Sequence, residues 1–322
     1  MPRLSEFDII KTFFNQPGLG ARPGEITRLG IGDDCALLSV PPGKELALSM
    51  DTLVEKIHFP ENAPPELLAW RALSVNLSDL AAMGATPVGF TLSLAMPAVN
   101  ESWLQQFSTG LKNCAEKFHC HLLGGDTTRG PLTITIQVHG LVSSGQALVR
   151  SGASAGDNIY VSGSLGLAAL SITRFDEALD QSLLDEAFYK PVPRLALGSG
   201  AAGLASAGID ISDGLLADLG HVCLASSKGA ELQLADIPVS PSLEKSMNAE
   251  EALALALTGG DDYELILTAP PSREDEMQTL AQSVDTPLVC IGKITDAEGI
   301  TCFDGLGEQR TFQKSGYQHF NA

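Results

Sequence analysis

The sequence has 322 residues, which suits about two domains of ordinary size. Its 20 Lys and Arg residues stand against 39 Asp and Glu, and the resulting net charge of −19 at pH 7 repels a nucleic-acid backbone, so nucleic acid is excluded as a partner. Hydrophobic residues make up 44 % of the chain, which excludes wholesale disorder, and no uncharged apolar stretch approaches the roughly 20 residues of a membrane helix.

The first residues and the cysteines both indicate a cytoplasmic protein without membrane contact. The opening MPRLSEFDII lacks the long apolar core of a secretory signal. The six cysteines are scattered and form no CxxC pair, so reduced thiols in a cytosolic protein are the simplest interpretation.

Hydrophobic periodicity predicts both helices and strands in the first half of the chain. Ser5 and Asp8 form a capping-box pattern ahead of a short helix, and glycine and proline predict a loop over 17–24. Apolar residues at helical spacing predict long helices at 64–84 and 101–118, the first with Pro at its start and Gly at its stop. Alternation predicts strands at 45–49, 88–95 and 132–142.

A Gly- and Ser-rich segment over 143–157 is the best candidate for a domain boundary, which gives domains 1–145 and 146–322. The second domain opens with a strand at Asn158 and has a helix after Gly214. Further strands are expected near 264–268 and 288–292. Because strands and helices mix without strict alternation, each half is predicted to be α+β.

Three other motifs carry weaker signals. GSGAAG at 198–203 has the spacing of a dinucleotide-binding loop, but it follows a poor strand in an Ala-rich segment, so a closely packed helix is favoured. His119-Cys120-His121 has no second ligand pair nearby, which favours the entry of a strand over a metal site. Neither Gly43-Lys44 nor Gly292-Lys293 is followed by Ser or Thr, so a P-loop kinase is excluded.

Six short segments place aspartate among small residues. Asp and Gly are favoured in turns, so any one segment is explained by an ordinary turn. Two of them adjoin strand-like apolar segments, however, where an unpaired acid is costly to bury. The segments are Gly32-Asp33-Asp34, Met50-Asp51-Thr52, Ser78-Asp79, Gly124-Gly125-Asp126-Thr127-Thr128, Asp210-Ile211-Ser212-Asp213-Gly214 and Gly259-Gly260-Asp261-Asp262.

Asp79 breaks a local rule in an otherwise good helix. It lies about one turn from the expected C-terminus, where a negative charge opposes the helix dipole by roughly 0.3–1 kcal/mol. Its neighbours Leu77 and Leu80 are apolar, so an open face is not expected. A cation would resolve this conflict, and carboxylates without His or Cys suit magnesium.

Phosphate is the ligand that fits beside such a metal. Glycine next to the acids allows the backbone to approach a phosphate closely. Ser212 is expected to cap the helix that opens at Gly214, whose first amides are candidates to hold an anion. The residues alone therefore predict magnesium-dependent phosphate chemistry.

Taken together and in order, the motifs resemble the thiamine-monophosphate kinase family, from about residue 6 to residue 320. They are GIGDDCA (30–36), MDTLVEKIHF (50–59), ALSVNLSDLAAMGATP (72–87), LGGDTTRG (123–130), GIDISDGL (208–215) and GGDDYEL (259–265). The wider relatives include aminoimidazole ribonucleotide synthetase. The resemblance implies that fold in two domains: an N-terminal α+β domain that binds ATP and magnesium and dimerises through its strands, and a C-terminal α/β domain that completes the active site. The apolar faces of strands 90–94 and 132–138 suit such a homodimer, but also suit an ordinary core.

The resemblance also implies three sets of site residues and no covalent catalyst. The ligands of several Mg²⁺ ions would be Asp34, Ser49, Met50, Asp51, Asp79, Asp126, Asp210 and Asp213. ATP would contact Gly125, Asp126, Arg150 and Ser212, and thiamine monophosphate would contact His58, Asp261 and Tyr317. The family commonly has Thr in place of Met50, which is harmless if only the carbonyl ligates, and Glu in place of Asp261.

Simpler roles stay open for several of these residues. His58 is equally a turn or core histidine, Arg150 a surface charge of the linker, and Tyr317 a packed terminus. Asp33 is equally a cap or a second carboxylate beside the metal.

The implied reaction is ATP-dependent phosphorylation of thiamine monophosphate to thiamine diphosphate. A phosphate acceptor with a second pKa near 6 is largely ionised at pH 7, so no general base is needed and direct in-line transfer is expected. Three alternatives remain: a related ATP-using synthetase acting on another small molecule, a non-catalytic sensor of a magnesium–nucleotide complex, and a metal-dependent phosphohydrolase.

Overall fold

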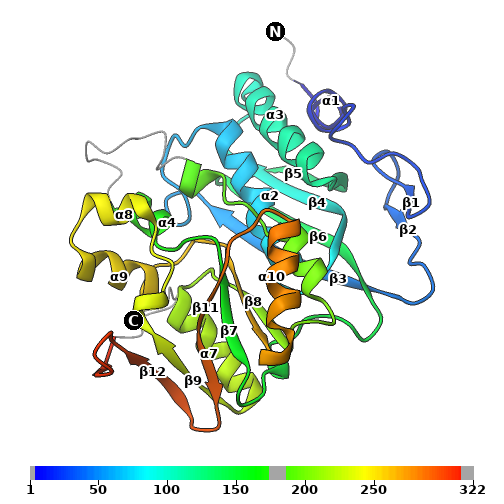
Figure 1. Ribbon diagram of the computed structural model, residues 1–322. Helices are drawn as coiled ribbons and strands as arrows, with labels where there is room; N and C mark the ends of the chain where they lie inside the picture. The colour runs from blue at the N-terminus through cyan, green and yellow to red at the C-terminus, as the bar shows by residue number, and fades with distance from the viewer. Residues whose placement is uncertain (1–3, 174–185, 313–322) are drawn as a thin grey trace. The chain divides into compact units, whose positions relative to one another are not determined.

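The computed structural model describes residues 4–173 and 186–312, so Tyr317 lies outside the described residues. The chain forms two compact units that divide between Gly145 and Gln146, and the short segment Ala81–Gly84 belongs with the second unit (Figure 1). Within the described ranges, no helix is long and apolar enough to cross a membrane.

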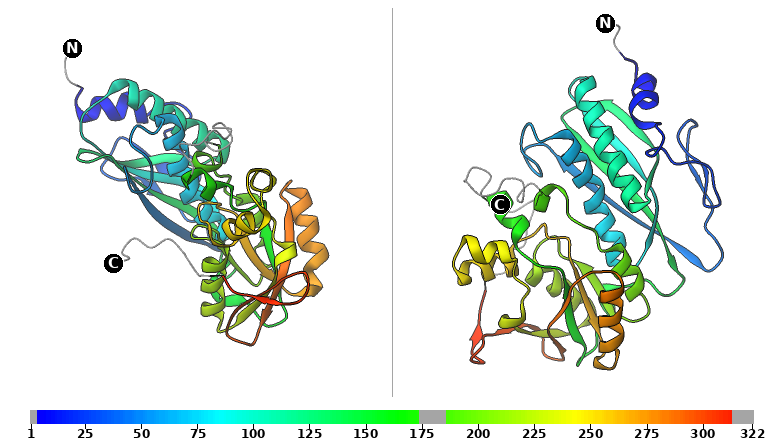
Figure 2. Two further views of the ribbon diagram at one scale, coloured as in Figure 1. Left: turned by 90° about the vertical axis from the view of Figure 1, so that its left-hand side faces the viewer. Right: turned by 45° about the horizontal axis from the view of Figure 1, so that its top comes forward.

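The first unit is a four-stranded sheet with two long helices on one face (Figure 2). The strand order is β3-β6-β4-β5; β4 and β5 are parallel, and the other neighbouring pairs are antiparallel. The elements are β3 (Lys44–Val54), α2 (Pro65–Ala82), β4 (Thr86–Met96), α3 (Glu101–Phe118), β5 (His121–Arg129) and β6 (Thr133–Ser143). They are preceded by α1 (Glu6–Ile9), the π-helical turn η1 (Ile10–Phe14), β1 (Thr27–Leu29) and β2 (Leu37–Leu38).

The helix-covered face of this sheet is the core of the first unit. Alternate residues of β4 and β6 point to this face, as the period of a strand requires. Those that are almost fully buried are Phe90, Leu92, Leu94, Ile134, Ile136 and Val138. The apolar faces of 90–94 and 132–138 suited either a dimer contact or an ordinary core. Their burial places them in the core of the first unit.

The edge strand β3 exposes apolar side chains on its other face. Leu46, Leu48 and Met50 alternate along the strand and keep 40 %, 53 % and 60 % of their surface exposed. Ser49 and Asp51 alternate with them on the opposite face, and both form hydrogen bonds with residues of α2. This face of β3 is thus an uncovered apolar row at a sheet edge.

The second unit is a seven-stranded sheet between helices. Its order is β13-β12-β9-β11-β7-β10-β8, and all neighbours are antiparallel except β9 and β12. The strands are β7 (Asn158–Ser162), β8 (Ala207–Asp210), β9 (Gly229–Gln233), β10 (Leu265–Ala269), β11 (Leu288–Thr295), β12 (Gly299–Phe303) and β13 (Gln309–Arg310). The helices are α4 (Leu167–Thr173), α6 (Leu195–Ala201), α7 (Leu215–Ser226), α8 (Pro241–Ser246), α9 (Ala249–Thr258) and α10 (Glu274–Ser283), with 3₁₀ turns η2 (Arg150–Gly152), η3 (Leu234–Asp236) and η4 (Pro271–Arg273).

Both faces of the central strands in the second unit are buried. In β7, Ile159 and Val161 pack into the cluster that contains α7, whereas Tyr160 packs into the cluster that contains α6 and α10. Every residue of β7 and β10 is buried, which explains why neither strand alternates between apolar and polar residues as a half-exposed strand does.

The helices and strands predicted from periodicity are confirmed, and their ends differ by a few residues. The Ser5–Asp8 capping box is present, with both reciprocal hydrogen bonds. GSGAAG lies mostly in α6, so it forms a helix and not a dinucleotide-binding loop. A Cβ on Gly198 would overlap the carbonyl oxygen of Ala81, which confirms that this helix is closely packed. His121 begins β5, as predicted for the His-Cys-His segment.

Candidate active site

The first acidic group lies where β3 meets α2, and consists of Ser49, Asp51 and Asp79. The Ser49 hydroxyl donates to Oδ2 of Asp79 over 2.5 Å. The backbone N–H of Asp51 donates to Oδ1 of Asn76 over 3.0 Å, and the Asn76 amide donates in turn to the Ala72 carbonyl within α2. These bonds tie the strand to the helix and bring the three oxygen-bearing side chains together.

The electrostatics of this group favour a cation. Although Asp51 keeps much of its surface exposed, its pKa is raised to about 6. Loss of hydration around the carboxyl is the largest cause and the charge of Asp79 adds to it, whereas Arg71 acts in the opposite direction. Arg71 is buried on α2 and supplies one positive charge against two carboxylates. A hard divalent ion with oxygen ligands fits this donor set, which contains no His or Cys.

The second acidic group lines a cavity of about 600 Å³ beside β5. Asp34, Gly125 and Asp126 all belong to its wall, together with residues of α1, η1 and the 30–36 loop. Gly125 has φ +154°, and a Cβ there would overlap the carbonyl oxygen of Leu92, so only glycine fits. The Asp34 N–H donates to the Asp33 carboxylate over 2.9 Å, a contact inside the 30–36 loop.

Strand register separates these two groups within one chain. Asp51 lies beside Ile136, which lies beside Leu92, which lies beside Gly125, so the row crosses the whole sheet. Three strand spacings amount to roughly 14 Å. Asp126 also points to the opposite face from Asp51, because it is one residue beyond Gly125. Since magnesium binds oxygen at about 2.1 Å, Asp51 and Asp126 of one chain cannot ligate the same ion.

The third acidic group is the turn between β8 and α7 in the second unit. Asp210 is buried at the end of β8, and Ser212 and Asp213 follow it. The helix begins at Gly214 without a side-chain cap on that residue. Instead, Oδ2 of Asp218 accepts hydrogen bonds from three consecutive backbone N–H groups, those of residues 212, 213 and 214, at 3.0–3.1 Å.

The predicted Ser212 cap and the anion-binding amides therefore need correction. The carboxylate of Asp218 reaches back from the first turn of α7 and satisfies three amides at once, which a single hydroxyl at Ser212 does not do. The backbone N–H groups that were expected to bind an anion are thus already hydrogen-bonded to Asp218. Ser212 still lies next to Asp213, and its backbone N–H, not its hydroxyl, makes the hydrogen bond that organises this turn.

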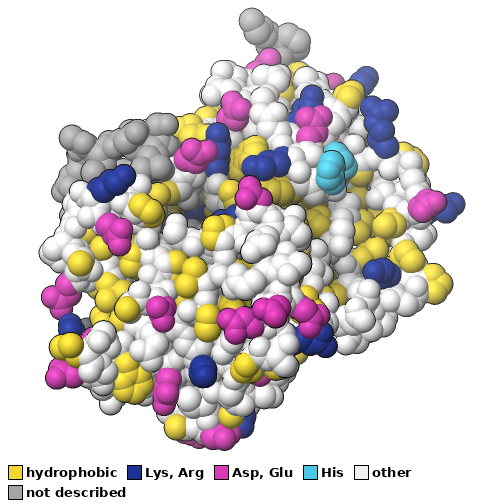
Figure 3. Space-filling view, in the orientation of Figure 1, with side chains coloured by type: hydrophobic (Ala, Val, Ile, Leu, Met, Phe, Trp, Pro, Cys, Tyr) yellow, Lys and Arg dark blue, Asp and Glu magenta, His cyan; other side chains and the backbone are white. Residues whose placement is uncertain are grey.

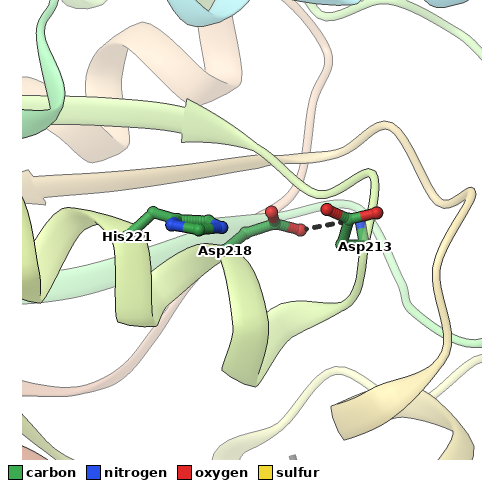
Figure 4. A group of neighbouring side chains, drawn as sticks. All are labelled: Asp213, Asp218 and His221. Atoms are coloured by element: carbon green, nitrogen blue, oxygen red, sulfur yellow. Dashed lines mark hydrogen bonds between the residues drawn. The ribbon is translucent and has the colours of Figure 1, made fainter. Parts of the chain in front are cut away.

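Asp218 and His221 join Asp213 in a small cluster that sequence reasoning missed (Figure 4). One ligand atom from each of the three lies within 4.8 Å of the others. The pKa of Asp218 is raised to about 7, chiefly because its carboxyl loses hydration. The backbone N–H groups that it accepts from lower the pKa, and the charge of Asp213 raises it. The spacing of three residues between Asp218 and His221 on one helix was the available signal.

The GGDDYEL segment packs against the same turn. The Asp261 N–H donates to the Ser212 carbonyl over 2.9 Å, and the Tyr263 N–H donates to the Ile211 carbonyl over 2.8 Å. The Tyr263 hydroxyl donates to Oδ1 of Asp261 over 3.0 Å. Two motifs far apart in the sequence are thus joined, and Asp261 lies in a fixed position beside the third acidic group.

A buried ion pair holds the base of this segment. Arg194 donates from Nε and Nη2 to the carboxylate of Glu264, which also accepts from the Ser162 hydroxyl. Both oxygens of the half-buried Asp262 accept from the Gly166 N–H at 2.9 Å, and loss of hydration around its carboxyl raises the pKa of Asp262 well above its usual range. These contacts anchor the segment directly after Asp261.

The remaining predicted residues have simpler surroundings. His58 accepts a hydrogen bond at Nδ1 from the Val54 N–H over 3.0 Å, as a turn histidine does. Arg150 is exposed on η2, and its carbonyl accepts from the Ser226 hydroxyl over 2.9 Å. On the face drawn in Figure 3, acidic side chains are scattered and not gathered into one patch. All six cysteines are free thiols.

Known family domains cover most of the chain. Residues 32–142 match the domain described as AIR synthase related protein, N-terminal domain, and residues 154–305 match the corresponding C-terminal domain. The protein is therefore a two-domain member of the AIR synthase-related class, and the predicted fold class is confirmed.

Similarity to known proteins narrows this class. The chain is 43 % identical to thiamine-monophosphate kinase of Escherichia coli strain K12 over 323 residues, which cover 98 % of each chain. The crystal structure of thiamine-monophosphate kinase from Stenotrophomonas maltophilia K279a superposes with a TM-score of 0.82 at 38 % identity, covering 94 % of this chain and 96 % of that one. A structure described as AaThiL complexed with AMPPCP and TMP has a TM-score of 0.77 at 27 % identity, covering 98 % and 96 %. The chain belongs to the thiamine-monophosphate kinase family, so the resemblance of its motifs is confirmed, and it is an enzyme of the kinase class.

Proposed function

We propose that this protein transfers the γ-phosphoryl group of ATP to thiamine monophosphate by direct, magnesium-assisted in-line displacement, giving thiamine diphosphate and ADP. The observation that carries the proposal is the oxygen-only group of Ser49, Asp51 and Asp79 in a chain whose relatives are named thiamine-monophosphate kinases. A relative's complex with AMPPCP and TMP supports the choice of the two substrates.

The proposal gives each predicted residue a role. Asp34, Ser49, the Met50 carbonyl, Asp51, Asp79, Asp126, Asp210 and Asp213 are assigned to magnesium. Gly125, Asp126, Arg150 and Ser212 are assigned to ATP, and His58, Asp261 and Tyr317 to thiamine monophosphate. When bound, magnesium neutralises charge on the phosphate oxygens that are brought together.

The chain's own residues act by positioning. Because the Ser49 hydroxyl donates its proton to Asp79, its oxygen lone pairs stay available for a cation. Because the Asp51 N–H donates to the Asn76 side chain, the backbone that carries the Asp51 carboxylate is held in place on β3. The acceptor phosphate is already largely ionised at pH 7, so no side chain has to remove a proton from it.

We propose in addition that the protein is a cytoplasmic homodimer. The apolar row of Leu46, Leu48 and Met50 on the edge strand β3 supports dimerisation, because a long uncovered edge invites strand pairing. Pairing of β3 with the β5 edge of a second copy would also bring Asp51 of one copy toward the strand that carries Asp126 in the other. The six free thiols suit a reducing compartment.

The proposal is tested by incubating the purified protein with ATP, magnesium and thiamine monophosphate and separating the products by chromatography. Stoichiometric thiamine diphosphate and ADP are expected, and a chelator should abolish both. Release of phosphate without an acceptor would indicate a phosphohydrolase, and ATP binding without turnover on any acceptor would indicate a sensor.

The metal assignment is tested with Asp51→Asn and Asp126→Asn. Each removes one negative ligand at nearly constant volume, so kcat should fall about 100-fold or more while the melting temperature changes little. Asp296→Asn, which loses only a surface ion pair with Lys228, is the matched control and should keep wild-type kcat. Wild-type rates in both site variants would contradict the assignment.

A further inference from the structure

The segment that carries Asp261 has an unusual backbone. Asp261 has φ +69° and Tyr263 has φ +51°, so both lie in the left-handed region, where a residue with a side chain is sterically disfavoured. Aspartate tolerates this region better than most residues, whereas a bulky tyrosine there is uncommon. Such strain persists only where surrounding contacts impose it, and it gathers at functional sites.

Backbone contacts account for the path of this segment. The Asp261 N–H donates to the carbonyl of Ser212, and two residues later the Tyr263 N–H donates to the carbonyl of Ile211. A Cβ on Gly260 would overlap the Ser212 carbonyl oxygen, so the two stretches of chain lie in close contact. These contacts fix the backbone at Asp261 without using the side chain of Tyr263.

The hydrogen bond between the two side chains has a different effect. The Tyr263 hydroxyl donates to Oδ1 of Asp261 over 3.0 Å. Asp261 is half-buried, and an aspartate side chain has several staggered rotamers. The hydroxyl favours the rotamer that brings Oδ1 within its reach, and a hydrogen bond to a charged acceptor is stronger than one between neutral groups. This bond therefore fixes the direction of the carboxylate and not the path of the chain.

The direction of a carboxylate matters to this acceptor. Thiamine monophosphate carries both a positively charged ring and a phosphate, and a carboxylate attracts the first and repels the second. We propose that Tyr263 is a positioning residue, whose hydroxyl holds the Asp261 carboxylate in the orientation that binds thiamine monophosphate. The inference rests on the proposed function, which assigns Asp261 to this acceptor.

The experiment compares wild type, Tyr263→Phe, Asp261→Ala and the double variant. Steady-state kinetics give KM for each substrate, and calorimetry with magnesium present gives Kd for thiamine monophosphate. Tyr263→Phe removes only a hydroxyl, so KM and Kd for thiamine monophosphate should rise about tenfold, while KM for ATP stays unchanged. Asp261→Ala should raise both acceptor values at least as much. In that background Tyr263→Phe should cause no further change, because Tyr263 acts only through the carboxylate.

Tyr160→Phe is the matched control. The Tyr160 hydroxyl also forms one hydrogen bond, accepting from the Asn158 amide over 3.1 Å, but it lies in the core of the second unit. Its loss should lower the melting temperature and leave both KM values unchanged.

An unchanged Kd for thiamine monophosphate in Tyr263→Phe would overturn the inference. An equal rise in KM for ATP would also overturn it, and so would a further tenfold loss when Tyr263→Phe is added to Asp261→Ala. Wild type that binds thiamine monophosphate but forms no thiamine diphosphate counts against the proposed function and not against this inference, because calorimetry measures the acceptor without turnover.

Discussion

At the scale of single residues, the site is recognisable because it breaks rules that the surrounding sequence obeys. Asp79 lies in an otherwise apolar part of α2, and Asp51 lies in the middle of β3. Both positions are poor places for an isolated carboxylate. The raised pKa of Asp51 is the physical expression of that conflict, and Asp79 contributes to it.

This conflict predicts a dependence of metal binding on pH. The pKa of Asp51 is raised from 3.8 to about 6, so a growing fraction of Asp51 is protonated as the pH falls through 6, and a protonated carboxyl is a poor metal ligand. The half-saturating magnesium concentration should therefore rise between pH 7.5 and pH 5.5 in activity or calorimetric titrations. Asp51→Asn should show a weaker dependence over this range.

The same shift has a consequence for the metal-free protein. Because the folded state binds the Asp51 proton more tightly than the unfolded chain does, this group favours folding at low pH and loses that contribution as the pH rises through about 6. Magnesium should consequently raise the melting temperature more at pH 7.5 than at pH 5.5. An equal shift at both pH values would contradict the role of Asp51.

At the scale of elements, the start of α7 shows how one side chain organises a functional turn. Asp218 accepts three consecutive backbone N–H groups with one oxygen, and so fixes the turn that carries Ser212 and Asp213. The 259–263 segment packs on that turn through backbone hydrogen bonds, so its position depends on the same contacts.

Asp218→Ala should therefore weaken both the fold and the reaction. Three amides near the buried start of α7 lose their acceptor, and the free energy of unfolding should fall by about 2–3 kcal/mol, as measured by urea denaturation. Asp218→Asn keeps a carbonyl acceptor and should recover much of the stability. If Asp218→Ala is as stable as wild type, the three hydrogen bonds do not organise this turn.

At the scale of the whole molecule, strand order decides which acidic residues one copy of the chain can bring together. Asp51 and Asp126 lie at opposite edges and on opposite faces of the same sheet. Neither substitution nor a side-chain rotation brings them together within one chain. The uncovered row on β3 offers the route by which a second copy would complete the arrangement.

Leu48→Lys tests this route, because it places an ammonium group in the centre of the apolar row. Burying that unpaired charge costs several kcal/mol, so the dimer dissociation constant should rise at least about 100-fold. Analytical ultracentrifugation at micromolar concentration should show a dimer for wild type and a monomer for the variant. Leu224→Lys, at an exposed site in the second unit, should stay dimeric. A monomeric wild type would refute the dimer.

The sequence by itself determined the elements, the fold class, and most of the acidic positions. Helical and strand periods depend on local spacing, so α2, α3 and β6 are found near their predicted ends. Several acids among glycines, taken as a set, indicate phosphate and metal chemistry, although each segment alone suits an ordinary turn. The local context also favoured a helix at GSGAAG, because the segment is Ala-rich and lacks the preceding strand that a dinucleotide-binding loop requires.

Only the tertiary structure decided which acids are neighbours. Strand order sets the separation of Asp51 from Asp126, and strand order arises from long-range pairing that no local pattern records. The same holds for the Asp218 cap, where a residue of the first helical turn replaced the expected Ser212, because the folded turn directs three amides to one carboxylate. Local spacing therefore determines what each residue can do, whereas the pairing of distant segments determines which residues act together.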